Sequence, residues 1–86
     1  MEVELTQKAK KDLLYWKSIG KSDILKRIRV LVESIQEVPF SGIGKPEPLK
    51  YQLAGKWSRR INDEHRIIYS IVDNTIYIHS LKEHYK

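Results

Sequence analysis

The sequence predicts an α+β domain in which two N-terminal helices pack on one face of a small, mainly antiparallel sheet. Apolar residues recur every three or four positions in the first half of the chain, whereas β-branched and aromatic residues form short runs in the second half. Helices followed by consecutive strands, rather than alternating with them, favour this fold class. With 86 residues, the chain is expected to form a single domain, residues 1–86.

A short strand and a first helix are expected at the N-terminus. Val3 and Leu5 alternate with glutamates, which indicates a strand. Thr6 can cap a helix that begins at Gln7, and Gly20 can end it in a left-handed conformation. The apolar face of this helix consists of Ala9, Leu13 and Trp16. We expect Trp16 to be a core or interface anchor rather than a base-stacking platform.

A second helix is expected to be capped by Ser22 or Asp23 and stopped by Pro39. Its apolar stripe consists of Ile24, Leu25, Ile28, Leu31, Val32 and Ile35. Residues 39–50 then contain all three prolines and two of the four glycines, which predicts an ordered loop rather than a helix or an inner strand.

The remaining chain is expected to form a meander of strands. They are predicted at about Tyr51–Leu53, Trp57–Ile61, Arg66–Val72 and Thr75–Leu81. Asp73 and Asn74 suit a two-residue hairpin turn. That turn sets Val72 opposite Thr75, Ser70 opposite Tyr77 and Ile68 opposite His79. The core face then carries Ile67, Tyr69, Ile71, Ile76 and Ile78.

Arg66 falls on the other face of this sheet. If residues 62–64 form a three-residue loop, Arg60 lies directly opposite Arg66. Two like charges in this position repel each other unless an anion lies between them, and a substrate phosphate is one candidate. A shift of one residue in the loop would undo this pairing.

Composition and charge narrow the possible functions. The net charge is +5 at pH 7, so a polyanion is a candidate partner. Without cysteine there is no disulfide, thiolate metal site or cysteine nucleophile, and the histidines lack metal-site spacing. Apolar stretches are far shorter than the roughly 20 residues of a membrane span, and the first residues do not resemble a signal peptide. We therefore expect a cytoplasmic protein without metal or membrane contact.

Two segments carry the candidate chemistry. Glu47 lies between two prolines, and a carboxylate on such a stiff segment suits a catalytic base. The cations around it form either a phosphate site or an ordinary solvated surface; they are Lys45, Lys50, Lys56, Arg59 and Arg60. His84, followed by Tyr85, either frays with the chain end or folds over the sheet beside Arg66, where it could donate a proton near neutral pH.

Several longer motifs run in order through the chain. They are Leu14-Tyr15-Trp16, Pro39-Phe40, Gly42-Ile-Gly-Lys-Pro-Glu-Pro-Leu-Lys50, Trp57-Ser-Arg-Arg-Ile61, Glu64-His-Arg66 and His84-Tyr85. Together they resemble the YoeB toxins of the RelE/ParE superfamily, over nearly the whole chain from about Leu13 to Tyr85. Lys86, after the His-Tyr that closes typical members, is a departure from the pattern.

The resemblance implies a ribosome-dependent endoribonuclease that cuts mRNA in the ribosomal A site, with a compact RNase-like fold and no metal or cofactor. It also implies a homodimer and a cognate YefM-like antitoxin. By this resemblance Glu47 is the general base, Arg66 stabilises the transition state and His84 is the general acid. The RNA- or phosphate-binding residues are then Lys45, Lys50, Arg59, Arg60 and Tyr85.

Two other functions remain open from the sequence. A ParE-like protein would share the fold and inhibit DNA gyrase without cutting RNA, but would not need Glu47 and His84 at these positions. A non-catalytic module that binds RNA or an antitoxin would need the surface without the chemistry.

Overall fold

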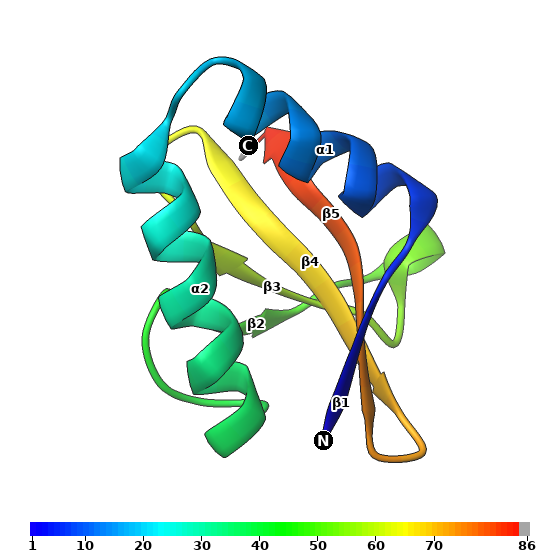
Figure 1. Cartoon of the computed structure of the whole chain (residues 1–86). Coiled ribbons are helices and arrows are strands. Elements are labelled where there is room, and N and C mark those ends of the chain that lie inside the picture. Colours follow the sequence, from blue (N-terminus) through cyan, green and yellow to red (C-terminus); the bar gives the residue numbers. More distant parts are fainter. Residues whose placement is uncertain (85–86) are drawn as a thin grey trace.

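A computed structural model describes residues 1–84 and shows two helices covering one face of a mixed sheet (Figure 1). The elements are β1 (Glu2–Leu5), α1 (Gln7–Ser18), α2 (Ser22–Glu37), β2 (Glu47–Pro48), the 3₁₀ helix η1 (Tyr51–Leu53), β3 (Trp57–Arg60), β4 (His65–Val72) and β5 (Thr75–His84). The described residues form a five-stranded sheet in the order β1-β5-β4-β3-β2. In this sheet β1 pairs with β5 in parallel, and the other neighbouring strands pair antiparallel. The predicted α+β class is confirmed.

The boundaries of α1 are those that its sequence predicts. The Thr6 hydroxyl accepts a hydrogen bond from the Ala9 amide at 3.2 Å, which is a side-chain N-cap. Gly20 adopts φ +69° just beyond the end of the helix. Within residues 1–84, no helix combines the length and apolar character that crossing a bilayer requires.

The start of α2 differs from the prediction. The N-cap position is occupied by Lys21, which makes no side-chain capping bond, so the expected cap at Ser22 or Asp23 is wrong. Both residues lie within the first turn instead, where Asp23 is the acidic residue favoured by the helix dipole. The helix ends at Glu37, two residues before Pro39, as expected.

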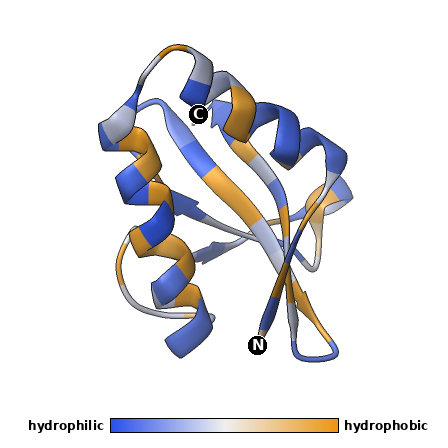
Figure 2. Ribbon diagram, in the orientation of Figure 1, coloured by the Kyte–Doolittle hydropathy of each residue, from blue (hydrophilic) through white to orange (hydrophobic). Residues whose placement is uncertain are grey.

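The core lies between the two helices and the sheet. Its buried apolar residues are Ala9, Trp16, Ile24, Ile28, Leu31, Ile35, Ile61, Ile67, Tyr69, Ile76, Ile78 and Leu81. Figure 2 shows apolar bands along α2 and in the middle of β4, separated by hydrophilic positions. The predicted core face of the β4–β5 hairpin is confirmed, with Ile71 half-buried at its edge. Trp16 is the expected anchor, and its Nε1 donates to the Leu81 carbonyl at 2.8 Å.

The strand register is predicted correctly next to the turn and fails further along. Asp73 and Asn74 have positive φ, and the Val72–Thr75 and Ser70–Tyr77 pairs form as expected. The expected pairing of Ile68 with His79 is wrong, because a β-bulge sets Ile68 opposite Ser80. His79 is the extra residue in this part of β5.

The segment between residues 39 and 56 is also partly different from the prediction. It is mainly loop, and its short strand β2 lies at the sheet edge, so no inner strand forms there. The expected strand at Tyr51–Leu53 is wrong. Tyr51 has φ +59°, and hydrogen bonds from Leu53 N to Lys50 O and from Ala54 N to Tyr51 O close 3₁₀ turns.

Candidate active site

The predicted acidic and basic residues meet on the face of the sheet that the helices leave open. Glu47 on β2 pairs with Ser58 on β3, and Arg60 on β3 pairs with Arg66 on β4. Side chains of directly paired residues point to the same face, and alternate residues along a strand share that face. Glu47, Ser58, Arg60 and Arg66 therefore form one group, which we call the sheet-face site.

The loop before β2 positions Glu47. The amide of Arg60 donates to the Gly44 carbonyl at 2.7 Å, which fixes the loop on β3. Gly44 has φ +81°, and a Cβ there would lie 2.7 Å from Leu31 Cδ2, so a larger residue would push the loop away from the core. The stiff Pro46–Pro48 segment follows directly. Glu47 therefore emerges from backbone that is held at both ends.

Arg66 and Glu47 form the centre of the sheet-face site. The Arg66 Nη1 atom lies 3.5 Å from Glu47 Oε1 and donates to Ser58 Oγ at 3.0 Å. The Arg66 side chain is only 16% exposed, whereas that of Glu47 is 55% exposed. The guanidinium is thus held against the sheet, and the carboxylate remains accessible to a ligand.

Sequence reasoning did not identify Ser58. It is 2% exposed and acts as a hydrogen-bond acceptor that orients Arg66. The predicted register could have identified Ser58. It places Ser58 opposite Ile68, which is two residues from Arg66 and on the same face of the sheet.

The predicted Arg60–Arg66 pairing is confirmed. Two guanidinium groups directly opposed on neighbouring strands repel each other. Glu47 supplies one negative charge beside Arg66, and Glu83, the β5 partner of Arg66, supplies a second. A phosphate could additionally accept hydrogen bonds from guanidinium groups placed in this way.

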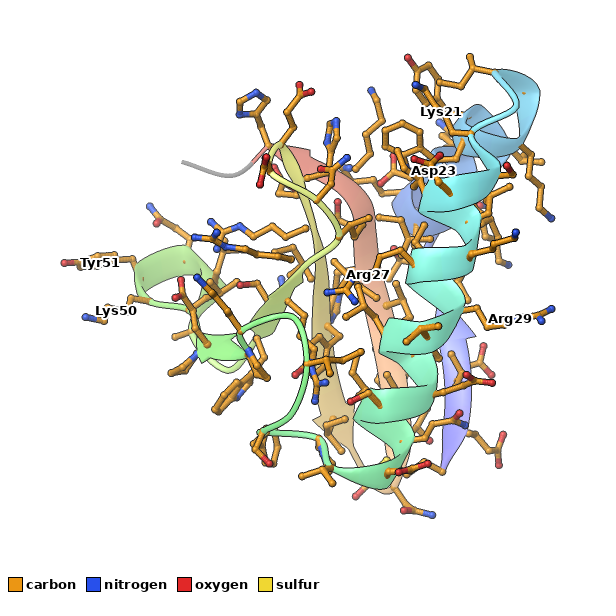
Figure 3. The ribbon with its side chains drawn as sticks, turned by 90° about the vertical axis from the view of Figure 1, so that its left-hand side faces the viewer. Lys21, Asp23, Arg27, Arg29, Lys50 and Tyr51 are labelled. Atoms are coloured by element: carbon orange, nitrogen blue, oxygen red, sulfur yellow. The ribbon has the colours of Figure 1, made fainter. Side chains whose placement is uncertain are left out.

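Lys45 and Lys50 are both exposed. Figure 3 shows Lys50 pointing away from the sheet, next to Tyr51 at the start of η1. These lysines therefore contribute positive charge at the periphery of the sheet-face site rather than at its centre. Lysines at this distance from the centre of the site can still attract a polyanion, because electrostatic attraction acts over a long range.

Arg59 was expected to bind RNA, and the structure overturns this expectation. Its side chain is completely buried on the helix side of the sheet. Its hydrogen-bond acceptors are Ser34 Oγ (2.7 Å), Ile43 O (3.2 Å), Val38 O (2.6 Å), Ser41 O (2.7 Å) and Tyr69 Oη (3.2 Å). Arg59 is a structural cation that ties the end of α2 and the following loop to β3.

His84 ends strand β5 and lies away from its expected position. The strand pairing sets it opposite His65, with 6.2 Å between the two ring centroids. The His65 ring in turn packs edge-on against Trp16 of α1, which places both histidines on the helix side of the sheet. The expected position of His84 beside Arg66 is therefore wrong for this structure. Tyr85 lies outside the described residues.

Across residues 1–84, no group of three or more His, Asp or Glu side chains is arranged to hold a metal ion. What the site offers is an accessible carboxylate beside guanidinium groups, an arrangement suited to proton abstraction next to a phosphate.

Comparisons with known proteins point to one family. The family model described as YoeB-like toxin of bacterial type II toxin–antitoxin system matches residues 5–85. Toxin YoeB of Synechocystis sp. is 46% identical over 86 residues, covering 100% of this chain and 99% of the relative. Toxin YoeB of Escherichia coli K12 is 46% identical over 74 residues, covering 86% and 87% of the two chains.

Solved structures agree with this match. A YoeB/ParE toxin from Agrobacterium tumefaciens has a TM-score of 0.93 at 33% identity and covers 99% of this chain and 100% of its own. The YoeB dimer from Staphylococcus aureus has a TM-score of 0.90 at 41% identity, with 99% and 98% coverage. A heterotetrameric YoeB–YefM toxin–antitoxin complex from the same organism gives 0.89, also at 41% identity and with the same coverage.

Proposed function

The chain belongs to the YoeB-like toxins of bacterial type II toxin–antitoxin systems, and on this premise we propose that it is a ribosome-dependent endoribonuclease that cuts mRNA in the ribosomal A site. The observation that carries this proposal is the Glu47 carboxylate held 3.5 Å from the Arg66 guanidinium on the open face of the sheet. A protein that only occupied a partner's surface would not need an accessible base beside a phosphate-binding group.

The reaction requires little beyond these groups because RNA carries its own nucleophile. Glu47 takes the proton from the 2′-hydroxyl, and the 2′-oxygen forms a bond to phosphorus. Arg66 donates to the non-bridging oxygens as negative charge accumulates on them, with Arg60 adding positive charge. The bond from phosphorus to the 5′-oxygen then breaks, leaving a cyclic 2′,3′-phosphate and a 5′-hydroxyl.

The leaving 5′-oxygen needs a proton, and we propose that His84 supplies it. In the structure His84 is one residue beyond Glu83, the partner of Arg66 on β5, but it faces the opposite side of the sheet. The proposal therefore requires the end of β5 to rotate when RNA binds, so that the imidazole reaches the Arg66 side. Tyr85 would orient the phosphate or this ring.

The proposal is tested by primer extension on mRNA in a purified translation extract. We expect wild type to produce cuts at codon positions and Glu47→Ala to produce none. Arg66→Ala should reduce cleavage about 10²–10³-fold, as for the loss of one preorganised transition-state donor. Lys26→Ala, which removes an exposed cation from the helix side, should cut like wild type.

Intact mRNA in the presence of wild type would contradict the nuclease proposal. Intact mRNA together with blocked DNA supercoiling by gyrase would support a gyrase inhibitor in its place. An Arg66→Ala variant that loses tenfold activity or less would remove Arg66 from its central role.

We also propose partners for this chain on the basis of its relatives. A solved S. aureus relative is a YoeB dimer, and another is a complex with the antitoxin YefM. We extend both assemblies to this chain, which would be a homodimer inhibited by a YefM-like antitoxin. Its target, mRNA on the ribosome, would place it in the cytoplasm.

A further inference from the structure

A cleft of about 420 Å³ lies beside the sheet-face site and has no role in the proposed catalysis. Its lining residues include Lys8, Leu53, Lys56, Ile68, His79 and Glu83. It is continuous with the site, because Ile68 shares the Arg66 face of β4 and Glu83 is the β5 partner of Arg66. We call it the β5 cleft.

Two departures from a regular sheet shape this cleft, namely a β-bulge in β5 and the early end of β1. The β-bulge makes His79 an extra residue, which re-aims its side chain. The ring is then held by Ser70, whose Oγ lies 2.7 Å from His79 Nε2. Strand β1 ends at Leu5, so the cleft opens along β5 between the start of α1 and η1, which Figure 1 shows on the same side of the molecule.

The chemistry of the lining suits a nucleotide. Leu53 and Ile68 provide apolar walls, and His79 provides a flat ring. Burial, and to a smaller extent the nearby Lys56 ammonium, hold the pKa of His79 below its usual 6.5, so the ring is neutral at pH 7. A neutral ring between apolar walls can stack with a base, whereas an ammonium group attracts a phosphate.

The charges at the rim are consistent with this use. Lys8 donates to Asp12 Oδ2 at 2.9 Å, so its charge is largely compensated. Glu83 faces the Arg66 side of the cleft. Lys56, whose ammonium lies near His79, is therefore the lining cation that we assign to a phosphate next to a base in the cleft.

We propose that the β5 cleft is a nucleotide subsite, which takes the base of an RNA residue next to the cleaved linkage while Lys56 contacts the adjoining phosphate. This inference rests on the proposed nuclease function, since it assigns a position along the same RNA. It makes His79 and Lys56 specificity-determining residues rather than catalytic ones.

Direct binding is measured by NMR of the full chain titrated with AMP, GMP, CMP and UMP. We expect the His79 ring signals to shift with at least one of them, and Lys56→Ala to weaken that binding roughly tenfold. Lys26→Ala, on the helix side, is the matched lysine control and should bind like wild type. His79 signals that do not move, or binding that Lys56→Ala leaves unchanged, would overturn the subsite.

Cleavage specificity provides the second measurement. His79→Ala should change the relative cutting of different codon contexts by about tenfold while cutting persists, whereas Tyr77→Ala, earlier on β5, should leave the pattern unchanged. An unchanged pattern in His79→Ala would refute the subsite even if wild type cuts normally. If wild type cuts nothing while nucleotides still shift His79, the nuclease proposal fails and the binding site remains.

Discussion

Arg59 and Arg60 are neighbours in the chain and lie in opposite environments, because successive residues of a strand face opposite sides of the sheet. Arg60 is half-buried on the open face opposite Arg66, whereas Arg59 is enclosed beneath α2. A buried cation is tolerated only where oxygen acceptors replace its hydration. The carbonyl groups that follow α2 do so here, with two of them at 2.6 and 2.7 Å from Nη2.

We expect Arg59→Ala to act through stability. Removing the guanidinium leaves several buried carbonyl groups without a donor and opens a cavity, so the free energy of unfolding should fall by about 3–5 kcal/mol. Urea denaturation followed by circular dichroism measures this change. The matched control is Arg60→Ala, for which we expect less than about 1 kcal/mol. A stable Arg59→Ala variant that had lost only RNA binding would restore the original prediction.

The structural role of Arg59 was partly accessible from the sequence. The predicted register, which sets Arg60 opposite Arg66, already directs Arg59 toward the core face. Its acceptors were not predictable, because Ser34 and the carbonyls after α2 are distant in sequence and meet Arg59 only after the loop has packed. For Glu47, the two flanking prolines indicated a stiff backbone from the sequence, and the structure sets its carboxylate beside Arg66. Its role as general base stays a prediction.

At the scale of elements, a single carboxylate joins α1 to β5. Asp12 is 8% exposed, and its Oδ2 accepts hydrogen bonds from Leu81 N and Lys8 Nζ, each at 2.9 Å, and from Ser80 Oγ at 3.3 Å. Burial alone would raise the pKa of Asp12. The hydrogen bonds from Lys8 and Leu81 outweigh burial and hold the pKa below its usual 3.8.

This lowered pKa predicts an acid-sensitive contribution to stability. The ionised carboxylate is favoured in the folded state, so its contribution is complete above about pH 4 and is lost as pH falls through the folded pKa. Asp12→Asn should cost about 1–3 kcal/mol between pH 5 and 7, and the difference from wild type should shrink below pH 4. Asp63→Asn, in an exposed loop, is the control. A difference that stays constant down to pH 2 would contradict this account.

The uncapped start of α2 provides a stabilising prediction. Lys21 occupies the N-cap without a side-chain acceptor, and Figure 3 shows it with Asp23 at the first turn of the helix. Lys21→Asp supplies an acceptor and removes a positive charge from the positive end of the helix dipole, so unfolding should cost about 1 kcal/mol more. Thermal unfolding of Lys21→Asp and of a Lys26→Asp control compares these effects. Equal changes in both variants would show that net charge, and not capping, is responsible.

Element types were predictable where local pattern and tertiary context agree. The apolar stripe of α2 and the alternation in β4 are such cases. The prediction failed at Tyr51–Leu53, whose residue types favour a strand. The backbone reverses at Tyr51, which has positive φ, and this reversal is required by the connection between β2 and β3 rather than by the local sequence. The register prediction also failed at the β5 bulge, because the alternating pattern of residues in the sequence does not reveal where one extra residue is inserted.

At the scale of the whole molecule, the two faces of the sheet have separate tasks. The helices cover one face of the sheet (Figure 1), and the core lies between them and that face. The second face carries the sheet-face site and the β5 cleft. The edge order places β2 and β4 on either side of β3, so Glu47 and Arg66 reach each other across one strand. The site still depends on the core through Gly44, whose close approach to Leu31 holds the loop that carries Glu47.

His84 and Arg66 lie on opposite sides of the sheet, so the proposed role of His84 as general acid can be tested separately. If it is the general acid, His84→Gln should reduce cleavage at least about 100-fold, whereas Lys82→Ala, at the same end of β5, should have little effect. A general acid is not needed when the leaving atom is sulfur. An mRNA with a 5′-bridging phosphorothiolate at the cleaved linkage should therefore restore cutting by His84→Gln and not by Glu47→Ala. If His84→Gln cuts ordinary mRNA at the wild-type rate, His84 stays on the Trp16 side of the sheet and a different group donates the proton.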